Sequence, residues 1–231
     1  MSLSLFRRAV VAGAAVSVGL TGSVGLRPVP AGAQQVRVDA AKRLASGAIT
    51  RRVLALRELE TATRAIVRLS EADRSALDQQ LQAQINGLTS LNAKIQGDVD
   101  LATVQADAGK IVTDHRVYVL TIPKARGVVV SDIELTAEDQ LSKLADRLQS
   151  TVDSSSKDAT KAKTDLASLR AKLTAVTGAV TPLPAGLLAL QPSGYPGNRA
   201  MLEQTRTALR TGRANLADAA ALARQVIADL K

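Results

Sequence analysis

His115 and the adjacent Asp114 are the residues of this chain best suited to catalysis, because a histidine oriented by a carboxylate is the usual base that activates a nucleophile. Adjacent residues on a helix do not face each other, however, and no G-x-S-x-G nucleophile motif occurs. The chain has one histidine and no cysteine, so the usual zinc ligands are missing. We predict that the protein is not an enzyme and holds no metal or cofactor; an enzyme subunit that uses His115 is the least favoured hypothesis.

Aromatic side chains are scarce, since Phe6, Tyr118 and Tyr195 are the only ones in the sequence. Pockets for small molecules are usually lined by such side chains, so the composition argues against a ligand pocket. A lone tyrosine near a helix junction either fixes how two segments pack or presents a patch to a partner. The residues assigned to this structural or partner patch are His115, Arg116, Tyr118, Pro123 and Tyr195.

The chain begins with the organisation of a secretory signal peptide over residues 1–33. Two arginines precede an uncharged apolar stretch at residues 9–26, and the small residues Ala31 and Ala33 form an A-x-A cleavage site. Cleavage there leaves Gln34 as the first of 198 mature residues, although the apolar stretch is also just long enough for a retained membrane anchor. We expect a secreted or envelope-associated protein, with Sec and Tat export both open.

The charge balance of the mature chain is moderately basic. The predicted signal peptide carries three arginines and no acidic residue, so its removal lowers the formal net charge from +9 to +6. A basic balance favours anionic partners such as an envelope polymer. Charges of both signs alternate along the expected helices, and no dense Lys/Arg cluster with interleaved aromatic residues occurs. We therefore expect no nucleic acid partner and keep an anionic wall polymer as the alternative ligand.

Apolar residues recur at spacings of three and four over most of the mature chain, which is typical of helices with one buried face. Residues 34–231 are therefore predicted to form a single all-α domain, either an elongated antiparallel bundle or a spectrin-like set of coiled-coil hairpins. The expected helices cover about residues 36–69, 71–96, 100–122, 124 or 136 to 156, 158–178 and 199–230.

The second expected helix has clear ends. Ser70 and Asp73 form a capping-box-like start, and Gly97 is suited to the left-handed conformation that often ends a helix. Because the joint at Ser70 is short, the first two helices form either an antiparallel hairpin or one kinked rod, and the strong cap favours the hairpin.

The central segment "TDHRVYVLTIPK" continues a heptad pattern that begins at Leu101. His115, Tyr118 and Ile122 fall in step with this pattern, which predicts an unbroken helix whose end or kink is at Pro123, because proline lacks the backbone amide. In this interpretation His115 is a packed residue hydrogen-bonded at its polar edge, and the end of the helix is deeply buried.

The region after Pro123 leaves two alternatives for Val128 to Val130, a short strand or a restarted helix; an isolated strand would lack a partner, so the helix is favoured. Thr136, with an acid three residues later, predicts a new capped helix start. Gly178 is expected to end the following helix, and Pro182 to begin a helix of two turns at most.

Two segments, "VTDHRVYVLTIPK" and "PSGYPGNRAML", resemble those of a group of uncharacterised, exported, Ala-rich helical proteins of actinobacteria. The resemblance covers most of the mature chain. It implies export and a coiled-coil-like helical fold, and it supplies no activity and no catalytic residue.

The leading functional hypothesis from the sequence is a secreted, non-enzymatic helical protein that acts by protein–protein contact at the cell envelope, as a spacer, scaffold or adaptor. Self-association through the helices would be one form of such contact. The second hypothesis is a binding module for an anionic envelope polymer. Fold alone does not fix a function, so the sequence leaves the partner and its pathway open.

Overall fold

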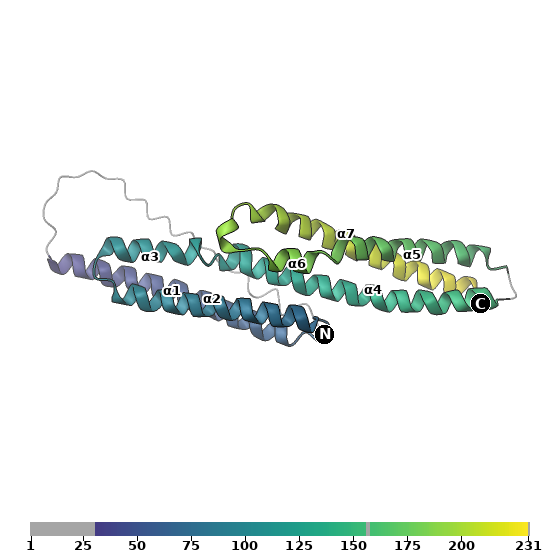
Figure 1. The fold of residues 1–231 in the computed structure, drawn as a ribbon, viewed down its shortest axis with the longest axis horizontal. Helices are drawn as coiled ribbons and strands as arrows, with labels where there is room; N and C mark the ends of the chain where they lie inside the picture. Colours follow the sequence, from purple (N-terminus) through teal and green to yellow (C-terminus); the bar gives the residue numbers. More distant parts are fainter. Residues whose placement is uncertain (1–30, 156–157, 231) are drawn as a thin grey trace. The chain divides into compact units, whose positions relative to one another are not determined.

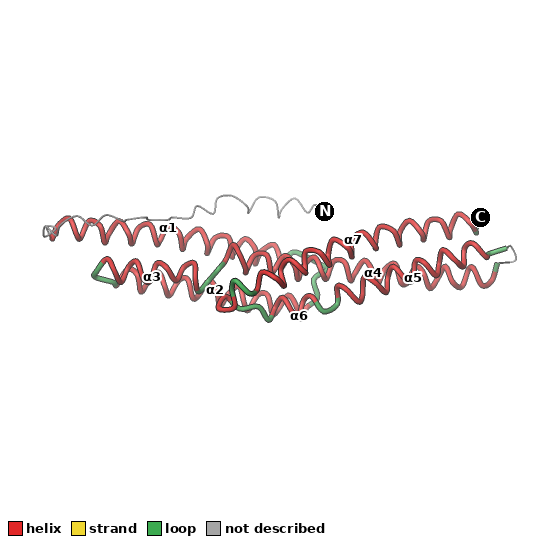
Figure 2. Tube along the Cα trace, turned by 90° about the horizontal axis from the view of Figure 1, so that it is seen from above, coloured by secondary structure: helices red, strands yellow, loops and turns green. Residues whose placement is uncertain are grey.

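The computed structural model describes residues 31–155 and 158–230, and every regular element in these ranges is helical. Figure 1 labels the helices, and Figure 2 shows them in red with the connecting turns in green. The long helices are α1 (Ala31–Arg64), α2 (Glu71–Gly97), α3 (Leu101–Thr113), α4 (Ile122–Ser154), α5 (Thr160–Val180) and α7 (Asn198–Asp229), with the short α6 (Leu183–Leu188) between the last two. The predicted all-α helical bundle class is confirmed.

The described chain divides into two compact units. Unit 1 contains the residues up to 65 and residues 78–122, and unit 2 contains residues 66–77 and 123–231. The first turns of α2 therefore belong to unit 2, and the remainder of that helix belongs to unit 1. The single-domain assignment of residues 34–231 stays a prediction.

Helices α1 and α2 form an antiparallel hairpin in unit 1, as the sequence predicted. In the middle of α1, Ser46 Oγ donates a hydrogen bond to Asn92 Oδ1, near the end of α2, at 2.6 Å. Near the end of α1, Arg64 Nε lies 2.9 Å from Asp78 Oδ2. Contacts whose residue numbers rise on one helix and fall on the other require opposite chain directions. The core between the helices is made of aliphatic residues at helical spacing, including Ile49, Leu56, Leu81, Leu88 and Ile95.

The turn between α1 and α2 begins earlier in the chain than predicted. Helix α1 covers 31–64 instead of 36–69, because residues 65–70 form a turn. The Arg74 side chain donates hydrogen bonds to the carbonyls of Ile66 and Leu69 and so satisfies groups that a continuing helix would use. The predicted cap at Ser70 is confirmed, since its Oγ accepts the amide of Asp73 at 3.1 Å.

Helix α3 completes a three-helix arrangement in unit 1. Asp107 of α3 is almost fully buried, and its carboxylate lies 2.8 Å from Lys94 Nζ of α2 and 2.7 Å from Lys110 Nζ. Hydrogen bonds from Lys110 and Lys94 lower the pKa of Asp107, so the pair of lysines keeps this buried carboxylate charged.

The predicted unbroken helix over residues 100–122 is wrong. Helix α3 ends at Thr113, Arg116 adopts a left-handed backbone conformation with φ 42°, and a π-helical turn, η2 (Val117–Thr121), follows. Helix α4 then begins at Ile122, so Pro123 lies in its first turn instead of ending a helix. The π-helical turn runs directly into α4, and the Ile122 amide donates to the carbonyl of Val117, five residues earlier. Apolar residues on both sides of the break preserve the heptad spacing, and this hides the break in the sequence.

Helix α4 is continuous from Ile122 to Ser154, so the predicted start at Thr136 is also wrong. The Thr136 hydroxyl donates to the carbonyl of Asp132, four residues earlier, as threonines inside helices do. Val128 and Val129 are helical and buried, which confirms the favoured alternative for this segment.

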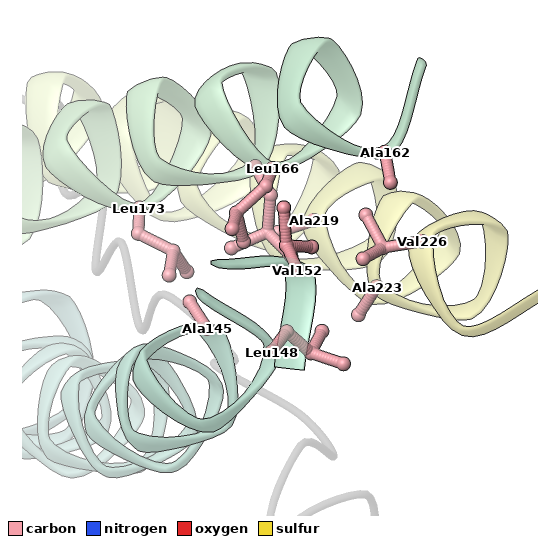
Figure 3. Packing of buried hydrophobic residues seen from close by; sticks show 10 residues of the cluster. Ala145, Leu148, Val152, Ala162, Leu166, Leu173, Ala219, Ala223 and Val226 are labelled. Carbon is pink, nitrogen blue, oxygen red and sulfur yellow. The ribbon is translucent and has the colours of Figure 1, made fainter. Parts of the chain in front are cut away.

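Unit 2 has its own hydrophobic core, formed by α4, α5 and α7. Figure 3 shows the cluster, in which Leu148 and Val152 of α4 lie beside Leu166 of α5 and Ala223 and Val226 of α7. Helices α5 and α7 are antiparallel, as shown by ion pairs of 2.7 Å between Lys161 and Asp229 and 2.8 Å between Lys172 and Asp218. Several contributing positions are alanines, which allow the helix backbones to approach closely.

The remaining helix ends agree with the sequence prediction except at Gly178. Helix α5 passes through Gly178 and ends at Val180. Gly178 does not adopt the left-handed backbone conformation with which glycine often ends a helix. The short helix after Pro182 and the final helix are both present. No helix among the described residues is long and apolar enough to cross a membrane.

Candidate functional site

His115 is half-buried and packs against α2 in unit 1. Its Nδ1 lies 3.0 Å from the side-chain oxygen of Gln84. A Cβ on Gly87 would lie 2.7 Å from His115 Cε1, so only glycine leaves room for the ring there. The Asp114 carboxylate accepts a hydrogen bond from the Thr113 hydroxyl. The ring nitrogen is thus held by an amide, in the packed role expected from the sequence.

The electrostatic surroundings of His115 favour the neutral imidazole. Burial lowers the pKa of His115, the charge of Asp114 opposes this effect, and the charge of Arg52 adds to it. The Arg52 guanidinium also lies over the Tyr118 ring, with 5.2 Å between its carbon and the ring centroid. His115 and Tyr118 are therefore brought together around Arg52, in a geometry typical of cation–π contacts between helices.

The other residues of the predicted patch are distributed along the chain. Arg116 is partly buried at the left-handed position between α3 and η2. Pro123 and Tyr195 belong to unit 2, in the first turn of α4 and directly after the 3-10 turn η3 (Pro192–Gly194). The structure therefore divides the predicted patch between two units. Of its members, His115 and Tyr118 of unit 1 are neighbours, through their shared contact with Arg52.

The predicted cleavage residues lie at the start of the described chain. Ala31, Ala33 and Gln34 fall in the first turn of α1, where Ala33 and Gln34 are exposed. Residues 1–30, including the predicted apolar stretch, lie outside the described residues. The signal peptide stays a prediction.

Glu134 is a buried carboxyl group that sequence reasoning missed. Its side chain is 5 % exposed, and Arg213 Nη2 of α7 lies 3.7 Å from Oε1. Among the described residues neither carboxyl oxygen has a hydrogen-bond partner. Burial raises the pKa of Glu134 to about 7, although the charge of Arg213 opposes the shift. Gly212 of α7 leaves room for this carboxyl group, because a Cβ at position 212 would lie 2.5 Å from Glu134 Oε2.

Other buried polar groups of α4 have structural partners in unit 2. Lys124 Nζ donates to the carbonyl of Leu190 at 3.0 Å, and burial lowers the pKa of this lysine. Asp132 accepts the amide of Ser70 at 2.6 Å. No group of three or more acidic or histidine side chains in residues 31–155 and 158–230 is placed to hold a metal ion.

The outward side of α1 carries exposed apolar side chains between unpaired arginines. Val36, Leu44 and Leu54 are 64 %, 70 % and 52 % exposed. Arg37, Arg43, Arg51 and Arg57 are exposed on the same side, and none of them has an ion pair within the described part of the chain. We call these seven residues the α1 outer face. It runs for about 32 Å at 1.5 Å per residue.

The outward side of α7 carries all of the arginines of that helix in a single row. Steps of seven, four, three and eleven residues bring each of them back to nearly the same side of a helix. We call these residues the arginine row: Arg199, Arg206, Arg210, Arg213 and Arg224. All are exposed, and the helical period displays them along about 38 Å.

Comparisons of the chain with protein-family models, with curated proteins and with solved structures returned no match.

Proposed function

We propose that the protein is exported and acts without catalysis, as a spacer, scaffold or adaptor that contacts another protein at the cell envelope. The observation that carries this proposal is the α1 outer face. Large apolar side chains exposed along one side of a helix are typical of interaction surfaces. Three of them occur on α1 within nineteen residues, at positions 36, 44 and 54.

The composition of the α1 outer face favours a protein as the occupant. Leucine side chains can enter apolar pockets of a partner, and removal of apolar surface from water is the dominant favourable term in most protein–protein association. Arginines around them can pair with acidic groups at the rim and speed association. A partner surface with apolar pockets and an acidic rim therefore fits this face.

Photo-crosslinking in the native organism tests the proposal. A photoreactive amino acid at position 44 should give an adduct of defined mass with one envelope protein, because Leu44 is 70 % exposed on the proposed contact face. The same probe at Gln105, an exposed polar position of α3, provides the control.

A second substitution distinguishes the face from the probe position. Leu54→Asp, ten residues from the probe on the same side of α1, should abolish the adduct if the whole face binds the partner. Equal adducts from positions 44 and 105, or an adduct insensitive to Leu54→Asp, would contradict the proposal. An adduct of twice the protein's mass would instead identify self-association as the contact.

Binding of an anionic envelope polymer is the second candidate function. The arginine row is the specific observation that favours it, because five guanidinium groups on one side of a helix create a local positive potential that attracts an anionic polymer. Retention of the secreted protein by isolated wall material should then fall steeply between low and high salt. Salt-insensitive retention would argue against this candidate.

A further inference from the structure

Two of the three acidic residues of α7 lie on a different side of the helix from its arginines, and the third, Glu203, pairs with Arg206. Its two aspartates, Asp218 and Asp229, pair with Lys172 and Lys161 of α5. Its arginines lie on another side, where Arg213 approaches Glu134 of α4. The two aspartates are thus paired with α5, whereas the arginines are exposed to solvent.

Most of the arginine row is free to bind a ligand. Arg199, Arg210 and Arg224 are exposed and have no ion pair among the described residues. Arg206 pairs with Glu203 at 2.9 Å, yet its side chain is 67 % exposed. The Arg213 side chain is 71 % exposed, and its acidic neighbour Glu134 is buried beneath it.

We propose that the arginine row binds a flexible linear polyanion whose charges are phosphate groups. This inference deepens the second candidate function, on which it depends, by naming the surface and the chemistry of the ligand. Arginine suits phosphate because its planar guanidinium donates two parallel hydrogen bonds to two phosphate oxygens. A row about 38 Å long offers such contacts at successive positions of one chain.

The spacing of the row favours a flexible chain over a rigid one. Successive arginines are separated along the helix axis by about 10, 6, 4.5 and 16 Å. A flexible polymer can adjust its path to these unequal steps, whereas a rigid duplex presents phosphates at fixed positions along curved strands. The ligand is therefore expected to follow the row as an extended single strand.

The residues between Arg213 and Arg224 argue against base stacking and insertion into a bilayer. Between Arg213 and Arg224 the same side of α7 carries Ala217 and Ala221. Alanines offer no stacking surface for nucleic acid bases and no bulky side chain for insertion into a bilayer. Phosphate charge is the ligand feature that this surface can recognise.

The proposal predicts how steeply the binding constant falls as the salt concentration rises. For single-stranded polyanions the logarithm of the binding constant falls with the logarithm of salt concentration, with a slope of roughly −0.7 per phosphate contact. Five contacts would give a slope of about −3.5, and the three unpaired arginines alone about −2. A measured slope between these values is expected.

The test uses long-chain sodium polyphosphate as the probe, titrated against the mature protein at several salt concentrations. The double variant Arg199→Gln/Arg210→Gln should reduce the magnitude of the slope by about 1.4 and weaken binding at least about fivefold at low salt. The control is Arg147→Gln/Lys163→Gln, which removes the same charge from exposed positions of α4 and α5 and should change binding much less. Circular dichroism verifies that both variants remain helical.

The outcomes distinguish a failure of the arginine row as the binding surface from a failure of polymer binding as the function. If the unmodified protein does not bind polyphosphate, the inference is wrong, whereas the second candidate function is refuted only if retention by wall material is absent or insensitive to salt. If it binds but the two double variants weaken binding equally, the arginine row is wrong while polymer binding survives. Tighter binding to duplex DNA or to anionic vesicles than to polyphosphate of equal charge would overturn the choice of a flexible polyanion.

Discussion

The buried carboxyl of Glu134 predicts a stability that depends strongly on pH. Glu134→Gln keeps the shape of the side chain and removes its ionisation. In the folded protein the pKa of Glu134 is about 7, against an ordinary value of 4.5, because burial disfavours the charged form. The unfolded chain therefore loses this proton at a lower pH than the folded chain does, and folding becomes less favourable as the pH rises.

The magnitude follows from the two pKa values. The contribution of the protonated carboxyl to stability is complete below pH 4.5, is lost progressively as the pH rises through 7, and is then constant. The resulting loss is about 0.8 kcal/mol at pH 5 and about 3.3 kcal/mol at pH 8. Relative to the unmodified protein, Glu134→Gln should therefore gain about 2.5 kcal/mol between these two pH values.

Urea denaturation followed by circular dichroism measures this difference. The free energy of unfolding is determined for both proteins at pH 5 and at pH 8. The comparison between pH values removes the cost of burying the glutamine amide, because that cost does not depend on pH. Other titrating groups are common to both proteins and cancel in the same way.

Arg213→Gln provides a second test of the same contact. The charge of Arg213 lowers the pKa of Glu134, so its removal should raise that pKa further and extend the loss of stability above pH 8. If Glu134→Gln has the same relative stability at pH 5 and pH 8, the carboxyl is not buried in the folded protein and the reasoning is refuted.

Three further predictions concern packing, the histidine and export. Gly212→Ala should destabilise unit 2 by about 1–3 kcal/mol through overpacking, because its Cβ would lie 2.5 Å from Glu134 Oε2. Gly178→Ala, where a Cβ would meet nothing within 4 Å, should instead stabilise by up to about 1 kcal/mol, and urea denaturation distinguishes the two. A proton NMR titration should place the pKa of His115 below 6.5, because the ring is half-buried; a value above 6.5 would show that the ring is not buried against α2. N-terminal sequencing of the protein isolated from its native organism should begin at Gln34, whereas a retained N-terminus would indicate an uncleaved anchor.

The sequence predicts helices well where local chemistry decides their ends. Helix α2 lies within one residue of its expected range because Ser70 caps its start. The break before η2 was missed because apolar spacing reports burial, and burial persists at Ile111 and Val117 on both sides of the break. Neither residue reveals that Arg116, between them, adopts a left-handed backbone.

The candidate sites were predicted only in part, because their partners come from distant positions. Packing of His115 follows from its place in the apolar pattern, but its partner Gln84 lies 31 residues earlier in the chain. Glu134 stands in a stretch that the sequence suggested was a helix start, where an acid is expected to face solvent. Only the packing of α4 against α7 makes it a buried acid. The spacing of the arginine row was present in the sequence, and alternating charge elsewhere concealed it.

The division of α2 between the two units limits how this chain can be rearranged. Unit 2 needs residues 66–77, where Leu69 and Leu77 are buried and the Ser70 amide binds Asp132. A fragment that starts at residue 123 would lack all three contributions. The two units therefore cannot be exchanged as separate contiguous segments of the chain, and an insertion within α2 would affect both of them. During synthesis unit 2 also needs α7, the last helix of the described chain, for its core, so its assembly must wait until the chain is nearly complete.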